Sequence, residues 1–294
     1  MRIGILSKGS RIYSTKRIRD SARERGHTVI VYNPLKCQLN LGQSQHSIYY
    51  NGRKIKPPDV LIPRIGASLT NYGISVVRQF QILRSRVLND SDSISRSRDK
   101  MRALQILDFE GIRIPKTVMA RNPNQLKRAL QLTDGPPVVL KLIEGTQGIG
   151  VILSETKESF ESTLDTLWNL GQDILIQQFV AESRGRDIRA FVVGDRVVAA
   201  MKREAAPEEF RANIHRGGTG KRVVLTKIQE ETAIKATKAL GLEISGVDFF
   251  DIPGEPIIIE LNSSPGLQGI EETTGIDVAA EIIRYAEKSF ETSD

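Results

Sequence analysis

The amino-acid sequence predicts a mixed α/β protein built from two or three packed domains. In the first third, strands and helices alternate in a β-α-β order, which is typical of a small parallel sheet. In the remainder, pairs of strands joined by short turns are interleaved with helices, which does not favour a single doubly wound sheet. The length of 294 residues also exceeds what one small core requires.

The first third contains three predicted strands and two predicted helices. Apolar, β-branched runs predict the strands, and apolar residues at helical spacing predict the helices. The expected order is strand Arg2–Ser7, helix Tyr13–Arg25, strand Thr28–Tyr32, strand Val60–Ile65 and helix Tyr72–Arg86. The glycines Gly4 and Gly9 do not form a GxGxxG dinucleotide fingerprint.

A polar, serine-rich stretch over Ser91–Arg98 is interpreted as a linker that ends the first domain. We expect domains at residues 1–96, 97–186 and 187–294. The elements predicted after the linker are helix Ser97–Glu110, strands Val138–Leu142 and Val151–Leu153, helix Lys157–Leu170, strands Asp173–Val180, Asp187–Val193 and Arg196–Arg203, helix Lys227–Leu240, strands Gly246–Asp251 and Pro256–Asn262, and helix Asp277–Phe290.

Charge is distributed unevenly along the chain. The first 100 residues contain 19 Lys and Arg against 6 Asp and Glu, whereas the remaining residues have a net charge of −6. A basic first third indicates an anionic partner, and a solvated basic surface without a specific partner is the alternative. Aromatic residues are sparse among these cations, so no RNA-stacking motif is evident.

Composition excludes several classes of protein. No apolar run approaches the roughly 20 residues of a membrane helix, and the segment from Met1 to Leu6 is typical of a buried strand rather than of a signal peptide. The single cysteine, Cys37, excludes an internal disulfide and a cysteine-built metal site. We therefore expect a cytoplasmic protein with no membrane partner.

Oxygen-bearing side chains gather on two strands near the C-terminus. Because residues two apart on a strand share a face, Glu260 and Asn262 point the same way. A turn near Gly254 lets Asp248 lie opposite Glu260, provided that the hairpin contains an odd-numbered loop or a β-bulge. Two carboxylates and an amide suit Mg²⁺ or Mn²⁺ and leave coordination positions for phosphate. The alternative is an ordinary hairpin with solvated polar residues.

A strand lysine precedes a glycine-rich loop. Lys141 closes an apolar run, and Gly145, Gly148 and Gly150 follow it. Glycines permit positive φ and let backbone N–H groups approach phosphate oxygens. The loop is not a Walker A motif, because no Lys-Ser/Thr pair follows the last glycine. A tight turn is the alternative, but the lysine and the separate oxygen cluster favour nucleotide binding.

Further polar residues lie between these two features. Arg211 and Asn213 share one face of an alternating stretch, and Arg203 precedes them. Guanidinium and amide groups there could hold a transferring phosphoryl group, so Arg203 and Arg211 are the predicted catalytic residues. His215 is interpreted as a loop residue, since no cysteine or serine nucleophile lies beside it.

In this order, these segments resemble the ATP-grasp superfamily and are most similar to the RimK-type glutamate ligases. The segments that carry the resemblance span nearly the whole chain: Ile62–Gly66, Arg98–Lys100, Lys141 with Glu144–Val151, Asp187–Arg189, Phe210–Gly218, and Asp248 with Glu260–Gly266. The resemblance implies an ATP-grasp fold with an N-terminal parallel-sheet (pre-ATP-grasp) domain. It also implies a ligase that adds glutamate to the C-terminus of a small-subunit ribosomal protein.

The resemblance further implies a role for each site residue. Lys100 and Lys141 would contact the ATP phosphates, and the loop with Gly145, Gly148 and Gly150 would cover them. Gln178 and Phe179 would border adenine, Asp187 would bind ribose, and Arg211 and Asn213 would lie at the phosphate end. Asp248, Glu260 and Asn262 would bind two Mg²⁺ or Mn²⁺ ions. The sequence departs from the family pattern at one place, where Gln178-Phe179 replaces an acidic residue followed by tyrosine.

The implied chemistry needs no protein nucleophile. A substrate carboxylate takes the γ-phosphoryl group of ATP to form an acyl phosphate, and the amine of glutamate then displaces phosphate. The basic first third fits an acidic protein tail as the acceptor. Two alternative functions stay open: a ligase that acts on a small carboxylate acceptor, and a non-catalytic nucleotide- or RNA-binding module. Assembly of the chain into a homo-oligomer also stays open.

Overall fold

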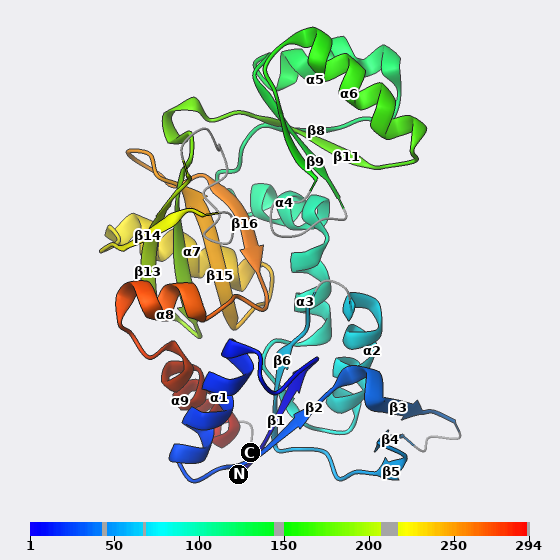
Figure 1. Ribbon diagram of the computed structural model, residues 1–294, viewed down its shortest axis with the longest axis vertical. Helices are drawn as coiled ribbons and strands as arrows, with labels where there is room; N and C mark the ends of the chain where they lie inside the picture. The colour runs from blue at the N-terminus through cyan, green and yellow to red at the C-terminus, as the bar shows by residue number, and fades with distance from the viewer. Residues whose placement is uncertain (43–45, 67–68, 144–149, 207–216, 293–294) are drawn as a thin grey trace.

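The computed structural model describes residues 1–42, 46–66, 69–143, 150–206 and 217–292. The described chain folds around three main sheets and one small sheet (Figure 1). This mixed α/β architecture confirms the predicted fold class.

The N-terminal sheet is parallel, with the order β2-β1-β6-β7. Its strands are β1 (Arg2–Ser7), β2 (Thr28–Tyr32), β6 (Val60–Arg64) and β7 (Arg86–Val87), and its helices are α1 (Tyr13–Glu24), α2 (Thr70–Ile82) and α3 (Ser91–Arg98). Ile3 and Ile5 pack in one core with α1 and with the C-terminal helix α9 (Val278–Glu291). Leu61 packs in a second core with Val76 of α2. The predicted parallel sheet is confirmed, and its two faces are covered by different helices.

Two sequence predictions in this region are wrong. The second helix ends at Ile82 rather than Arg86, because Arg84 adopts a φ of +67° and the chain then enters β7. The segment Ser91–Arg98 is helix α3 rather than a linker. Asp90 caps this helix by accepting a hydrogen bond from the Ser93 amide at 2.6 Å, which satisfies an amide at the helix N-terminus.

A small antiparallel sheet extends from the N-terminal part and was not predicted (Figure 1). Its strands are β3 (Cys37–Asn40), β4 (Ser47–Tyr50) and β5 (Arg53–Lys54). Ile48 anchors it in the core that contains α2.

The central sheet is antiparallel, with the order β10-β9-β11-β8. Its elements are β8 (Thr117–Met119), α5 (Leu126–Leu132), β9 (Val138–Leu142), β10 (Val151–Ser154), α6 (Lys157–Asn169) and β11 (Ile174–Gln178). Leu140 and Ile176 pack against Phe160 of α6. Since neighbouring residues on a strand face opposite ways, Lys141 and Gln177 lie on the other face.

The C-terminal sheet is antiparallel, with the order β14-β13-β12-β15-β16. Its strands are β12 (Arg186–Val193), β13 (Arg196–Glu204), β14 (Thr219–Arg222), β15 (Ile244–Phe250) and β16 (Ile258–Asn262), and its helices are α4 (Lys100–Phe109), α7 (Lys227–Ala239) and α8 (Gln268–Thr274). Val247 and Phe249 share a core with α4 and α7. Gly194, with a φ of +64°, forms the predicted turn between β12 and β13.

The second face of the C-terminal sheet is divided into two parts. Phe191 and Met201 pack in one core with α8 and α9, and polar side chains occupy the rest of this face.

Within the described residues, no helix is both long and apolar enough to span a lipid bilayer.

Candidate active site

Strand register brings the predicted metal ligands onto one face. Asp248 of β15 lies opposite Glu260 of β16, and the next pair on the same face is Gly246 opposite Asn262. The pairing then shifts, because Phe249 lies opposite Ile258 and leaves one extra residue in β16. A β-bulge is one of the two features expected to let Asp248 and Glu260 share a face. The predicted facing of these two residues is confirmed.

Two arginines, one on β12 and one on β13, hold Asp248. Arg189 donates from Nε and Nη2 to its two carboxylate oxygens at 2.7 and 2.6 Å. Arg203 approaches it at 2.9 Å through Nη2 and also makes a bidentate contact with Asp187 at 2.6 and 2.7 Å. The register places Arg189 opposite Asp248 and Asp187 opposite Arg203, so these four side chains form one network with no net charge.

Burial makes this network electrostatically strong. The Asp248 residue is 2% exposed and Arg203 is 6% exposed, so solvent screens their interaction little. Burial alone would raise the pKa of Asp248, but Arg189 and Arg203 outweigh it and hold that pKa below its ordinary value. Burial raises the pKa of Asp187 to about 6, although Arg203 acts in the opposite direction.

The other two predicted oxygen ligands lie in a more accessible setting. Glu260 is exposed, and Asn262 donates from Nδ2 to Glu260 Oε1 at 3.2 Å. The described residues contain no cluster of three His, Cys, Asp or Glu side chains that could hold a metal by itself. The predicted ligands Asp248, Glu260 and Asn262 would supply two carboxylates and one amide oxygen. This set fits a hard divalent cation that also takes oxygens from phosphate or water.

Lys141 lies within electrostatic range of this cluster. Burial lowers its pKa, the Glu260 carboxylate raises it, the Lys100 ammonium lowers it, and the net shift is downward. Lys100, at the start of α4, donates to the carbonyls of Leu142 and Ile143 at 3.0 and 2.7 Å. The two predicted phosphate-binding lysines thus meet at the end of β9, near Glu260.

The structure describes both ends of the β9–β10 hairpin that carries the glycine-rich loop. Leu142 donates its amide to the Gly150 carbonyl at 2.9 Å, which closes the β9–β10 hairpin. Gly150 has a φ of +75°, and a Cβ there would lie 2.7 Å from Leu142 Cδ1. Gly145 and Gly148, and likewise Arg211 and Asn213, lie outside the described residues.

The predicted adenine strand has its own polar contacts. Gln178 donates its amide to Lys116 O at 2.9 Å and its side chain to Asp134 Oδ2 at 2.7 Å. Lys116 also contacts Asp134 at 2.6 Å. Glutamate in place of Gln178 would face the Asp134 carboxylate, which gives a local reason for the departure from the family pattern. Phe179 stacks under Arg184, whose Cζ is 5.9 Å from the ring centroid.

Sequence reasoning missed two residues of the site region. Arg189 could have been found, because it lies two residues after Asp187 and therefore on the same face of β12. Asn89 could not, since its partners are 154 to 174 residues away in sequence. The buried Asn89 side chain donates to Ile244 O and Ser263 O at 2.7 and 3.0 Å and accepts from the Glu243 and Ile244 amides at 2.6 and 2.8 Å.

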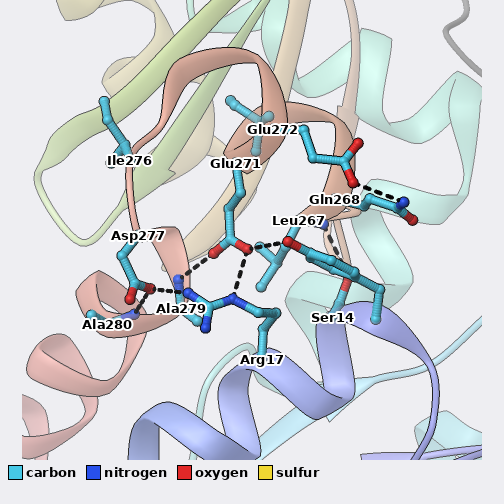
Figure 2. Close-up of polar contacts among 12 residues, drawn as sticks. Ser14, Arg17, Leu267, Gln268, Glu271, Glu272, Ile276, Asp277, Ala279 and Ala280 are labelled. Atoms are coloured by element: carbon cyan, nitrogen blue, oxygen red, sulfur yellow. Dashed lines mark hydrogen bonds and ion pairs between the residues drawn. The ribbon is translucent and has the colours of Figure 1, made fainter.

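The loop after β16 is held by the N-terminal part at alternate residues. Asn89 binds the carbonyl of Ser263, Arg64 donates to the carbonyl of Pro265 at 2.5 Å, and Leu267 donates to Ser14 Oγ at 3.0 Å. Figure 2 shows the last of these contacts beside a second cluster, in which Arg17 donates to the buried Glu271 at 3.0 Å. The chain that follows β16 is thus docked on the carboxyl ends of the parallel sheet and on α1.

Known proteins share both halves of this architecture. Residues 97–286 match the RimK-like ATP-grasp domain, and residues 1–94 match the RimK PreATP-grasp domain. The chain belongs to the RimK-like ATP-grasp family. It is therefore an ATP-dependent ligase.

Two relatives align with almost the full chain. A probable alpha-L-glutamate ligase of Chromohalobacter salexigens is 49% identical over 292 residues, covering 99% of this chain and 97% of that protein. A protein with the same description in Halorhodospira halophila is 48% identical over 289 residues, with 98% and 96% coverage.

Solved structures of low sequence identity share the fold. The ATP-grasp ligase PsnB, complexed with minimal precursor, Mg and ADP, superimposes with a TM-score of 0.76 at 17% identity, covering 99% of this chain and 98% of PsnB. A RimK domain protein from Sphaerobacter thermophilus superimposes with a TM-score of 0.73 at 20% identity, with 98% and 100% coverage. These likenesses confirm the ATP-grasp fold that the sequence predicted.

Proposed function

We propose that this ligase adds glutamate to the C-terminus of an acidic protein tail, with a small-subunit ribosomal protein as the acceptor. The observation that carries the proposal is the shared face of Asp248, Glu260 and Asn262, with Lys141 in electrostatic range of Glu260. Relatives that are 48–49% identical are described as probable alpha-L-glutamate ligases, which supports glutamate as the amine substrate. The basic first 100 residues, with their excess of cations, favour an acidic acceptor.

The reaction couples two displacements. An oxygen of the acceptor carboxylate bonds to the γ-phosphorus of ATP while the bond to the ADP oxygen breaks, which yields an acyl phosphate and ADP. The amine nitrogen of glutamate then bonds to the acyl carbon, phosphate leaves, and the nitrogen loses a proton. Each step is promoted by placing the reactants together and by countering negative charge on the phosphates.

The side chains divide this work between them. Lys100 and Lys141 would counter phosphate charge, while Asp248, Glu260 and Asn262 would hold two Mg²⁺ or Mn²⁺ ions. The bound ions would neutralise phosphate oxygens and favour in-line displacement. Arg203 already contacts two carboxylates; it would keep Asp248 ionised and add positive charge at the phosphate end. Gln178, Phe179 and Asp187 would border the nucleoside, and the loop of residues 145–150 would cover the phosphates, with Arg211 and Asn213 at the phosphate end.

A peptide acceptor is supported by the structural neighbours. PsnB has been solved with a precursor peptide, and the macrocyclase MdnC of Microcystis aeruginosa with the precursor peptide MdnA. Those proteins share this fold, with TM-scores of 0.75. We also propose that the ligase acts in the cytoplasm, where ATP and ribosomal proteins are both present.

The test is glutamate-dependent ADP release, with mass spectrometry of the acceptor. The protein, ATP, Mg²⁺ and glutamate are incubated with the intact ribosomal protein, with a variant that lacks its acidic C-terminal tail, or with small carboxylates. We expect ADP release and added glutamate residues with the intact protein alone. Release with small carboxylates alone would show a small-molecule ligase, and no release with any acceptor would overturn the proposal.

Substitution of the exposed metal ligand tests the site itself. Glu260→Gln should lower turnover by more than about a hundredfold, because a neutral amide binds a divalent cation more weakly than a carboxylate. Glu255→Gln is the matched control, since this exposed glutamate lies in the loop of the same hairpin. Wild-type turnover in the Glu260→Gln variant would overturn the metal assignment.

A further inference from the structure

The carboxyl ends of the parallel strands meet the loop that follows β16. The chain runs from β1 to β2 on one side of the sheet and then crosses to β6 on the other side of β1. Open α/β sheets bind ligands outside the carboxyl ends of their strands at such a change of direction. Arg64 is the last residue of β6 and lies beside Ser7, the last residue of β1.

Arg64 is a partly buried cation with little to bind. Its Nη2 donates to the Pro265 carbonyl at 2.5 Å. Burial alone accounts for the lowering of its pKa to about 10, and within the described residues no carboxylate forms an ion pair with it. Since a guanidinium has five N–H donors, most of its hydrogen-bonding capacity is left over.

The other arginines near this site each have several partners. Arg189 and Arg203 are paired with carboxylates, and Arg98 donates to the carbonyls of Ile65 and Gly66 and to Thr70 Oγ1. Arg64 has no carboxylate partner and makes one hydrogen bond within the described residues, whereas Arg98 makes three. Its charge and its remaining donors are therefore available to an anionic ligand.

A second unsatisfied group lies on the same loop. The hydroxyl of Ser264 is buried and has no hydrogen-bond partner among the described residues. Ser264 directly precedes Pro265, the residue that Arg64 contacts. Pro265 also packs against Gly246, on the face of β15 that carries Asp248, since a Cβ at Gly246 would lie 2.9 Å from Pro265 Cβ. The cation and the hydroxyl thus flank one short loop beside the predicted metal strand.

Docking of the loop does not require the charge of Arg64. Asn89 and Ser14 hold the same loop at Ser263 and Leu267 with neutral groups. A neutral donor would satisfy the Pro265 carbonyl equally well, without the cost of burying a cation. Lys8 and Arg11 are exposed in the loop after β1, so the potential at this edge is positive.

We propose that Arg64 and Ser264 form the subsite that binds a carboxylate of the amino-acid substrate. The inference rests on the proposed function and names the residues that hold its amine substrate. The ligand class is a dicarboxylic amino acid, whose carboxylate accepts hydrogen bonds from the guanidinium and the hydroxyl while its amine is free to react. Charge-assisted hydrogen bonds of this kind are the stronger ones in proteins.

The test separates the Michaelis constants of the three substrates. Arg64→Gln should raise the KM for glutamate by about 10- to 100-fold, the size expected for loss of a charge-assisted contact. The KM for ATP and the KM for the acceptor should change by less than about threefold. Ser264→Ala should raise the glutamate KM by about three- to tenfold, and Arg64→Lys should restore part of the loss because it keeps the charge.

Ser14→Ala is the matched control, because it removes a neutral contact to the same loop. We expect it to leave the glutamate KM unchanged. An unchanged glutamate KM in Arg64→Gln, a rise in the acceptor KM in its place, or a rise of equal size in Ser14→Ala would each overturn the inference. If Arg64→Gln does not fold, Arg64→Lys and Ser264→Ala decide. Wild-type protein without glutamate-dependent ADP release would instead count against the proposed function.

Discussion

The two carboxylates that face each other on β15 and β16 differ in burial. Asp248 is enclosed by two guanidinium groups, whereas Glu260 is exposed and contacts the amide of Asn262. The same chemical group therefore has different consequences when it is removed. Loss of Asp248 leaves buried cations short of an anion, and loss of Glu260 leaves the protein interior unchanged.

We expect Asp248→Asn to destabilise the protein by about 3 kcal/mol or more, the usual cost of breaking a buried ion pair. The free energy of unfolding of Glu260→Gln should lie within about 0.5 kcal/mol of the wild-type value. Calorimetry without nucleotide or metal measures both. Equal thermal midpoints for Asp248→Asn and the wild type would contradict the network as a source of stability.

The sign of the pH effect at Asp248 follows from its lowered pKa. Its contribution to stability is present above the pKa of an unfolded aspartate, about 3.9, and is lost as the pH falls through the lower folded value. We therefore expect no loss from this carboxylate between pH 7 and pH 5. A fall in thermal midpoint over that range in the wild type that is absent in Asp248→Asn would contradict this expectation.

The single cysteine should be unreactive in the folded protein. Cys37 is buried, and burial raises its pKa to about 11. At pH 8 the thiolate fraction should be roughly a hundredfold below that of an ordinary cysteine. A chromogenic disulfide reagent should react slowly with native protein and at once in denaturant. Because this pKa is raised, its contribution to stability falls as the pH rises from about 9 toward 11.

The residue scale is also where sequence reasoning succeeded most. The period of two along a strand was enough to align Glu260 with Asn262 and to set Asp248 against Glu260. It was not enough to find Arg64, whose partner Pro265 is 201 residues away. The roles in nucleotide binding assigned to Lys100, Gln178 and Asp187 stay predictions, as do the domain boundaries.

At the scale of elements, local composition misled where packing decided the structure. Serines made Ser91–Arg98 look like a linker, yet Asp90 supplies a cap and Ile94 is buried against α2. The short strands of the small fourth sheet are equally hard to predict, because two to four residues carry too little periodicity. Long elements with caps, such as α7 with its Thr226 capping box, were predicted almost to the residue.

Gly150, which ends the loop of the β9–β10 hairpin, yields a prediction about this element. Gly150 combines a positive φ with close contact to Leu142, whereas Gly171 has a φ of +71° and open space around its Cβ position. Gly171→Ala should cost about 1–2 kcal/mol from backbone strain alone. Gly150→Ala should cost a further 1 kcal/mol or so, because Leu142 must move. Thermal unfolding of both variants measures the difference, and equal losses would show that the contact is unimportant.

At the scale of the whole molecule, the N-terminal and C-terminal parts are joined by contacts between residues far apart in sequence. Asn89, Arg64 and Ser14 hold the loop after β16, and α1 packs on α9 in one core. No local sequence pattern predicts such contacts, because each partner residue also fits the helix, strand or loop in which it lies. These contacts hold β16, the strand of the proposed metal ligands, in a fixed position relative to the carboxyl ends of the parallel sheet.

The Glu271 cluster between α1 and α8 should act as one unit in this docking (Figure 2). The buried Glu271 accepts from Arg17 at 3.0 Å and from the Ala279 amide at 3.1 Å, and Arg17 also contacts Asp277 at 2.9 Å. Arg17→Ala and Glu271→Ala should each speed hydrogen exchange in α1 and α9 by about tenfold, which corresponds to roughly 1.4 kcal/mol.

The double variant should exchange only slightly faster than the more affected single variant, because each substitution removes the same contact. Lys227→Ala is the control, since it breaks an exposed pair with Glu231 on α7 and such pairs contribute little. Exchange in α7 should be unchanged in the Arg17 and Glu271 variants, because α7 packs in a separate core. Fully additive effects in the double variant would show that the two side chains stabilise the interface independently and that the cluster is not a unit.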